Sequence, residues 1–527
     1  MGGLTTAVLL AKRLGQRVLV LEQHFKIGGF THIFQRQGKY HWDVGLHYVG
    51  QMGKGETPRQ IMDYLTNGQV EWQPMPEPFE QFVYPDFTFP VYGDKQRYQG
   101  DLIALFPQEE AAIKRYFQDI GKASSWAIIP TMVANFAPGW LNGLLQVLLR
   151  PWGRIARQTT GEYLDRHFQS EQLKAILASQ WGDYGLPPSQ SAFGVHATIV
   201  SHYLNGGWYP VGSASALAEA MMPIIQEAGG QCLTQQSVTE ILVQNGTAYG
   251  VKAKNRKGET VEYHAPIIVS DAGAYNTYCQ FLPDDIAPNY QQQIKKFPQG
   301  TSALTLYLGL QDSPRSLGFQ GENHWIYNSY NHDESFAQAW SNPDTPPSGC
   351  YLSFPSLKNT AAEHHTAEII AFANYDHFAR WQETRWRKRG EDYQELKSQL
   401  SEQMIDLVEA RYPGFRDLIE YQELSTPLTV EYFENSDRGA IYGLPATPQR
   451  FQQPWAKAKT PVKNLYLTGA DSLMLGIMGA TMAGLTTTAV IEGGGPHFAK
   501  IMTAIKQEAA QKDASPNSEF TPHPQQG

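Results

Sequence analysis

The first 24 residues, MGGLTTAVLLAKRLGQRVLVLEQH, constrain the fold more than any other stretch of the chain. Gly3, Ala7 and Ala11 recur at every fourth position, so on a helix they form one stripe of small side chains that lets the helix lie close to a sheet. Gly15 stands where such a helix would end. The apolar run Arg17–Glu22 has the composition of a strand buried on both faces. The order helix, tight turn, strand and terminal acid is typical of a dinucleotide-binding α/β unit.

The spacing between glycine and acid favours the same interpretation. In the complete pattern, the last glycine allows close packing of helix and sheet, and an acid about 20 residues later binds the ribose hydroxyls. Here Gly3, next to Gly2, takes the place of the last glycine, and Glu22, followed by Gln23, lies 19 residues further on. Taken alone, the stretch also fits an ordinary α/β unit with a helix of small residues.

The first strand and the earlier glycines of this pattern do not precede Gly2 in the sequence. We therefore expect the sheet to lack its first strand, and we expect the chain as written to start inside a longer reading frame. The main phosphate cradle of the pattern is then incomplete. For that reason the chain starting at Met1 is predicted to bind a dinucleotide poorly.

Two further stretches are typical of the same domain. Gly28 and Gly29 come soon after the acid, where a second turn on the phosphate side is needed. Between residues 205 and 280, the sequence predicts an amphipathic helix, short strands with turns at Asn245–Gly246 and Lys257–Gly258, and a buried strand.

The third stretch, NLYLTGADSLMLGIMGATMAG, carries the strongest pattern. It predicts a buried strand, a loop that contains Gly469 and Asp471, and then a helix of small residues. The first backbone amides of such a helix favour an anion or a carbonyl oxygen as partner. The sequence thus predicts an α/β fold whose Rossmann-like domain is discontinuous, formed by residues 1–50, 205–280 and 460–500. Residues 51–204 and 281–459 form an inserted α+β substrate domain, and residues 511–527 are predicted to be a disordered tail.

Composition excludes some classes of function. Charged residues make up 18% of the 527 residues and the net charge is −9, which gives no indication of nucleic-acid binding. Cys232, Cys279 and Cys350 are far apart, so we expect neither a disulfide framework nor a zinc site. We therefore expect the protein to reside in a reducing compartment. The histidines show no metal-type spacing such as HExxH, and no metal is predicted.

Taken together, the motifs resemble the FAD-dependent family of phytoene desaturases, carotenoid isomerases and retinol saturases. The resemblance extends over nearly the whole chain, in the stretches RVLVLEQHFKIGGFTHIF, WDVGLHYVG, HYLNGGWYPVGSASALAEA, IIVSDAGAYNTY and NLYLTGADSLMLGIMGA. It implies that Glu22 holds the adenosine ribose, that Gly28 and Gly29 lie at the phosphates, and that the backbone of Val238 meets the adenine. Asp471 is implied at the ribityl or pyrophosphate region. Around the isoalloxazine ring, the implied residues are Gly45, Leu46, His47, Ile477 and Met478.

The family also implies a reaction. We expect an FAD-dependent oxidoreductase that adds or removes two hydrogens at a carbon–carbon double bond of a carotenoid or retinoid, with NAD(P) as a candidate electron partner. Saturation is the first expectation, and carotenoid isomerisation and phytoene-type desaturation are alternatives that share the motifs. A truncated, non-catalytic lipid-binding homologue is the alternative from another class. The sequence does not identify the proton partner, for which the candidates are His47, His202, Tyr203 and Tyr209.

The segment from Ser124 to Gln158 is unusually apolar and contains three tryptophans, with Arg150, Arg154 and Arg157 at its end. Helices with tryptophan and leucine on one side and arginines at the edge suit a membrane interface. A helical hairpin over the substrate cavity is the alternative. Prolines interrupt the segment, so we expect it to lie on the membrane rather than span it. The predicted location is therefore the cytoplasmic side of a membrane, as a peripheral protein.

Overall fold

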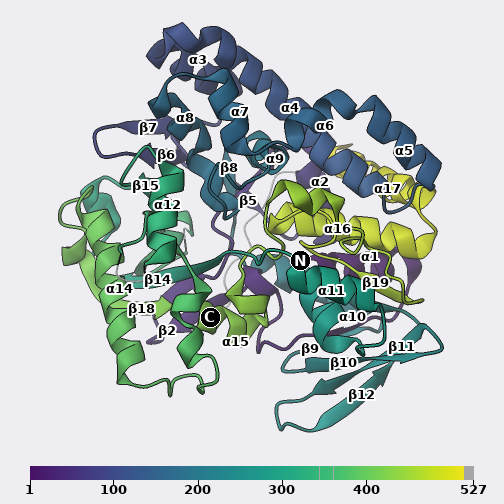
Figure 1. The fold of residues 1–527 in the computed structure, drawn as a ribbon. Helices are drawn as coiled ribbons and strands as arrows, with labels where there is room; N and C mark the ends of the chain where they lie inside the picture. The colour runs from purple at the N-terminus through teal and green to yellow at the C-terminus, as the bar shows by residue number, and fades with distance from the viewer. Residues whose placement is uncertain (343–344, 360, 515–527) are drawn as a thin grey trace.

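The computed structural model describes residues 1–342, 345–359 and 361–514, and brings three distant chain segments together in one α/β region (Figure 1). The first helix and strand form where the sequence predicts them, as α1 (Gly2–Leu14) and β1 (Leu19–Leu21). Gly15 ends α1 with a φ of +59°, a conformation that glycine adopts at little cost. The other elements of this region are α10 (Ala216–Glu227), β9 (Gln231–Leu233), β13 (Ile268–Ser270), β19 (Leu465–Leu467), α16 (Gly476–Glu492) and α17 (Gly495–Ala514).

The strands of this region pair in two short parallel ladders. Strand β1 pairs with β9, and β13 pairs with β19. Within the residues that the structure describes, no strand joins the two ladders. Helices α1, α10, α16 and α17 share one apolar core, to which Leu4, Val8, Leu485 and Ile501 belong. This arrangement confirms the predicted α/β class.

A three-stranded antiparallel sheet extends from this region. It consists of β10 (Ser237–Gln244), β11 (Thr247–Lys254) and β12 (Thr260–His264). The predicted turns join these strands, and both residues of the first, Asn245 and Gly246, have positive φ angles, as the tightest hairpin turns require.

The predicted α+β part is built on a seven-stranded sheet, seen at the left of Figure 1. Its pairs are antiparallel except for the parallel pair β15–β6. Helix α14 (Glu391–Glu409) covers one face, where Met404 and Val408 join the core. In sheet order the strands are β18 (Ile419–Ser425), β14 (Ser302–Leu310), β17 (His365–Ala373), β16 (Gly349–Ser353), β15 (Asn323–Tyr327), β6 (Glu80–Val83) and β7 (Thr88–Val91).

Small β elements and short helices connect these regions. The strands are β2 (Ile33–Arg36) paired with β3 (Tyr40–Asp43), and β4 (Val49–Gly50), β8 (Gly207–Pro210) and β5 (Trp72–Pro74) in one sheet. The helices are α2 (Thr57–Leu65), α11 (Pro288–Lys296), α12 (His332–Ser341), α13 (Pro355–Lys358) and α15 (Pro427–Glu434).

Helices from residues 95 to 203 cover the top of the molecule in Figure 1. None of the helices that the structure describes is both long enough and apolar enough to cross a bilayer. The apolar segment predicted to lie on a membrane forms the end of α4 and all of α5 and α6. The helices are α3 (Lys95–Leu105), α4 (Glu110–Val133), α5 (Gly139–Leu148), α6 (Arg150–Ala156), α7 (Thr160–His167), α8 (Glu171–Ala178) and α9 (Phe193–Tyr203).

The predicted tail begins four residues too early. Helix α17 continues to Ala514, so residues 511–514 are helical. The composition there, Gln-Lys-Asp-Ala, is polar but compatible with a helix, and the serine and proline that disfavour one come only afterwards. The rest of the predicted tail, 515–527, lies outside the described residues.

Candidate flavin site

A cavity of about 1050 Å³ lies between the α/β region and the seven-stranded sheet. This volume is at the upper end for ligand pockets in proteins. One end is lined by the start of α1, the residues after β1 and the turn after β13. The other end is lined by aromatic side chains of the seven-stranded sheet and of the helical layer. The cavity therefore connects the predicted nucleotide elements to the predicted substrate domain.

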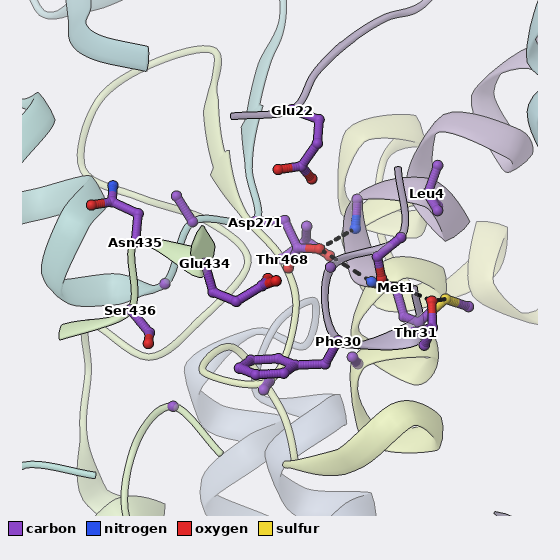
Figure 2. A pocket seen from close by; sticks show the side chains of 18 of the residues that line it. Met1, Leu4, Glu22, Phe30, Thr31, Asp271, Glu434, Asn435, Ser436 and Thr468 are labelled. Atoms are coloured by element: carbon purple, nitrogen blue, oxygen red, sulfur yellow. Dashed lines mark hydrogen bonds and ion pairs between the residues drawn. The ribbon is translucent and has the colours of Figure 1, made fainter. Parts of the chain in front are cut away.

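Acidic side chains surround the nucleotide end. Glu22 follows β1, its carboxylate accepts a hydrogen bond of 2.8 Å from the amide of His24, and burial raises its pKa. Glu434, at the end of α15, faces the same space, and burial together with the charge of Glu22 raises its pKa to about 8. Figure 2 shows both side chains, with Asp271, around the space beside Met1. The acid predicted to hold the ribose thus lines the cavity, although its two acidic neighbours were not predicted.

The glycine turn after Glu22 has a backbone that other residues rarely adopt. Gly28 has a φ of +128° and Gly29 a φ of +55°, and both line the cavity. A Cβ atom on Gly28 would lie 3.0 Å from Oγ1 of Thr31. The turn therefore depends on glycine both for its conformation and for its close approach to the chain that follows.

Gly2 and Gly3 have structural contacts at the start of α1. A Cβ atom on Gly2 would lie 2.5 Å from the backbone nitrogen of Gly469, so the two glycines allow α1 to approach the loop after β19. The amide of Gly3 donates a hydrogen bond of 2.7 Å to Asp271. Gly3 lines the cavity, whereas Gly2 and Gly469 lie behind its wall.

Asp471 lines the cavity and is itself held by the backbone. Its two carboxylate oxygens accept hydrogen bonds from the amides of Ala274, at 2.7 Å, and Leu444, at 2.8 Å. Helix α16 begins close by, and its N-cap residue, Leu475, gives it no side-chain cap. The first turn of α16 thus offers amides that lack intrahelical partners.

The remaining predicted cofactor residues divide between the cavity and the core. Leu46 is 1% exposed and belongs to the core, and Met478 likewise does not line the cavity. Those that line it are Gln23, Gly45, Val238 and Ile477.

The family model described as flavin containing amine oxidoreductase matches residues 1–491. The chain belongs to this family.

Individual relatives agree with this flavin-containing oxidoreductase family. All-trans-retinol 13,14-reductase of Danio rerio is 35% identical over 517 residues, covering 93% of this chain and 84% of the relative. Prolycopene isomerase 2, chloroplastic, of an Oncidium hybrid cultivar is 24% identical over 483 residues, covering 89% of this chain and 78% of that protein. The crystal structure of an oxidoreductase from Methanosarcina mazei matches with a TM-score of 0.61 and 15% identity, covering 93% of this chain and 98% of that one. The last likeness shows the fold alone.

The nucleotide end of this flavin-containing oxidoreductase fits FAD in its chemistry. A half-buried acid, Glu22, suits a ribose diol, and the glycine turn and the uncapped start of α16 offer backbone amides to phosphate and carbonyl oxygens. One amide is already engaged, because Gly3 donates to Asp271. The predicted cofactor FAD is therefore the one that the family and these residues support.

Of the four predicted proton partners, His47 alone lines the cavity. His202 accepts a hydrogen bond from the amide of Gly50 at 2.9 Å, and burial lowers its pKa to about 4. Tyr203 is buried in the core. Tyr209 donates a hydrogen bond to Asp43. These three side chains lie behind the cavity wall and help to hold the fold.

The aromatic end contains residues that sequence analysis missed. Asp183 lines the cavity, and its Oδ2 accepts a hydrogen bond of 2.8 Å from Tyr48. The many aromatic residues of the predicted substrate domain, 51–204 and 281–459, are the sequence signal for such a wall. This signal does not show which rings lie together in the fold. The aromatic residues of this wall are Trp181, Tyr307, Trp325, Tyr327, Tyr351, Phe372 and Tyr442.

Three potential metal ligands, His24, His32 and Glu434, meet beside the nucleotide end. Sequence spacing does not indicate this group, because Glu434 is more than 400 residues from both histidines. Nδ1 of His24 accepts a hydrogen bond of 3.1 Å from the amide of Lys26, and Nδ1 of His32 lies 2.6 Å from the carbonyl oxygen of Gly29. One nitrogen of each ring is thus used in a contact with the backbone, His24 before the glycine turn and His32 at Gly29, and we assign no metal to the group.

Proposed function

We propose that this flavin-containing oxidoreductase adds two hydrogens across a carbon–carbon double bond of a polyene isoprenoid of the retinoid or carotenoid class. The observation that carries the proposal is that one continuous cavity runs from the nucleotide end to a wall of aromatic rings. Such a wall suits a long conjugated hydrocarbon, which gains from burial of its apolar surface and from ring contacts. The names of the relatives support this choice, since one reduces retinol and another isomerises prolycopene.

The test is product analysis with the purified protein. Flavin is first identified by absorbance and mass after extraction. The chemically reduced protein is then incubated without oxygen with all-trans-retinol, and in parallel with a carotenoid. A product heavier by two hydrogens supports saturation.

The other outcomes separate the alternatives. A product of unchanged mass but altered geometry supports isomerisation, and loss of two hydrogens by the oxidised protein supports desaturation. Absence of bound flavin together with lipid in the extract supports a non-catalytic lipid-binding homologue. We propose a nicotinamide nucleotide as the electron donor. Bleaching of the flavin absorbance by NADH or NADPH in the absence of oxygen tests this proposal.

We further propose that helix α5 attaches the protein to the cytoplasmic face of a membrane. None of its ten residues is buried, and Trp140, Val147 and Leu148 are 73%, 69% and 67% exposed. Arg150 and Arg154 follow and are also exposed. An exposed apolar helix bordered by arginines fits a bilayer with anionic headgroups, which supplies both apolar depth and negative charge. The membrane would also be the reservoir of an apolar substrate.

A further inference from the structure

A buried carboxyl group stands directly behind the cavity wall at His47. Nδ1 of His47 lies 2.9 Å from Oε2 of Glu368, which is on β17 in the centre of the seven-stranded sheet. Glu368 is 0% exposed. Among the described residues, neither Nδ1 of His47 nor the carboxyl oxygens of Glu368 hydrogen-bond to another side chain, while the backbone amide of Asp43 also acts on the Glu368 carboxyl group. The 2.9 Å approach to His47 is thus the side-chain contact of this buried carboxyl group.

The neighbouring lysine does not take this carboxyl group as its partner. Nζ of Lys358 donates to the carbonyl oxygen of His47 at 2.9 Å, to Asn323 at 2.6 Å and to Ser353 at 2.6 Å. An ammonium group has three hydrogens, and these three contacts use them. Lys358 therefore holds the backbone of His47 in place and leaves Glu368 to its imidazole ring.

We propose that Glu368 is the proton source for reduction of the double bond, and that His47 passes the proton to the substrate carbon. This inference rests on the proposed function. Because His47 lines the cavity while its Nδ1 faces Glu368, its other nitrogen, Nε2, is the one available to a substrate. Glu368 acts only through His47 and touches no substrate itself.

The step balances as follows. His47 gives the hydrogen on Nε2 to one carbon of the double bond, while Nδ1 takes the proton of the Glu368 carboxyl group. Reduced FAD, when bound at the nucleotide end of the cavity, would supply the hydride, and with it two electrons, to the other carbon of the double bond. The imidazole stays neutral throughout and changes only its tautomer, and Glu368 ends as a carboxylate. Once the product has left, water in the cavity protonates Nε2, and the proton on Nδ1 returns to Glu368.

The surroundings keep the pair in the required state at neutral pH. Burial raises the pKa of Glu368 to about 8, so its carboxyl group is mostly protonated. Burial lowers the pKa of His47 to about 3, so its ring is neutral. The charged or titratable groups that act on the pair from the packed elements are Lys358 of α13, Asp43 of β3, Tyr209 of β8, Tyr307 of β14 and Tyr351 of β16.

The first test does not depend on turnover. Nitrogen-15 NMR of the histidine-labelled protein reports which ring nitrogen of His47 carries hydrogen, with His47→Gln used for assignment. We expect hydrogen on Nε2 below about pH 8 and on Nδ1 above it, because an ionised Glu368 requires a donor at Nδ1. In Glu368→Gln the switch disappears. A tautomer that ignores pH, or that switches equally in Glu368→Gln, overturns the proposal.

The second test uses single-turnover reduction of retinol. Glu368→Gln keeps the size of the side chain but has no proton to give, and we expect a rate at least 100-fold lower, in the range that acid catalysis supplies. The wild-type rate should fall as pH rises through about 8, and the residual rate of the variant should not. Glu420→Gln makes the same change at a surface ion pair with Lys39. This control should keep both the wild-type rate and the wild-type pH profile.

The outcomes of the second test are distinguishable. If the wild type reduces no polyene while His47 shows the tautomer switch, the proposed function fails, and only the coupled protonation of His47 and Glu368 is established. If the wild type is active and Glu368→Gln retains its rate and pH profile, the proton pair is not used and the inference fails. Unaltered flavin absorbance and melting temperature are required of Glu368→Gln. If it misfolds, Glu368→Asp replaces it, with a reduced rate and a shifted pH profile expected.

Discussion

The carboxylate of Asp271 accepts a hydrogen bond of 2.7 Å from the backbone amide of Gly3, and so joins the turn after β13 to the start of α1. The N-cap residue of this helix, Met1, provides no side-chain cap. Asp271 therefore does from a distance of 268 residues what an N-cap side chain does locally.

Asp271→Ala should lower the free energy of unfolding by about 1 kcal/mol, because a helix amide loses its acceptor and the helix dipole loses a nearby negative charge. Denaturant titration measures the change. Asp271→Asn keeps an acceptor oxygen and should cost less. Equal losses in the two variants would mean that the hydrogen bond is not the source of the stability.

Gly2→Ala should be more damaging. The added Cβ would lie 2.5 Å from the nitrogen and 2.6 Å from the Cα of Gly469, and backbone atoms cannot turn aside as a side chain does. We expect a loss of about 1–3 kcal/mol, the usual cost of overpacking, and a lower melting temperature. The control is Gly121→Ala in α4, where nothing lies within 4 Å of the new Cβ and helix propensity should add up to about 1 kcal/mol of stability. Similar melting shifts in both variants would contradict this account.

Replacing Trp140 and Val147 by glutamate should reduce binding to anionic phosphatidylserine vesicles at least tenfold, because two charges then lie on the apolar face of α5. Vesicle co-sedimentation measures the binding. Leu105→Glu, on the exposed end of α3, is the control and should bind as the wild type does. Undiminished binding of the double variant would exclude α5 as the contact.

Acid should destabilise the protein through histidines that are buried in the neutral form. Nδ1 of His332 accepts a hydrogen bond of 3.3 Å from Trp181, and burial lowers the pKa of His332 to about 4. Below pH 6.5 the unfolded chain binds a proton at this position and the folded chain does not. Stability is therefore fully present above pH 6.5 and is lost as the pH falls toward 4.

Between pH 7 and 4.5, this one group should cost roughly 2–3 kcal/mol. Denaturant titration of wild type and His332→Gln at the two pH values isolates it. The variant should be less stable at pH 7 but should lose less on acidification. An identical loss in both proteins would show that His332 does not contribute to the acid response.

Prediction from sequence succeeds where a pattern is local. The stripe of Gly3, Ala7 and Ala11 predicts α1, and the run that ends at Glu22 predicts β1, because periodicity and burial determine such elements over a few residues. The same local reasoning predicted the glycine turn, Gly28 and Gly29, which lines the nucleotide end of the cavity.

Prediction fails where strand pairing brings together residues that are distant along the chain. Glu434 reaches Glu22, and Glu368 reaches His47, across separations of more than 300 residues. The sequence around these residues contains no motif. The seven-stranded sheet places β17 beside β14 and β16, and no local periodicity of the sequence predicts this strand order. The opposite failure also occurs. His202 and Tyr209 lie close to glycines in the sequence and were predicted as candidates for the site, but the fold places neither of them at the cavity.

The packing of α1 has a consequence for biosynthesis. Leu4 and Val8 share their core with Ile501 and Ile505 of α17, and Lys12 pairs with Glu508 at 2.9 Å. These partners leave the ribosome almost 500 residues after α1, which at about 5–20 residues per second is a delay of roughly 25–100 seconds. During that time the part of α1 that meets α17 lacks its partner in the nascent chain, although α10 follows α1 by only about 200 residues. The core around α1 should therefore be completed only after the last helix has been released, and chaperones that shield this surface should raise the yield of the protein in a cell.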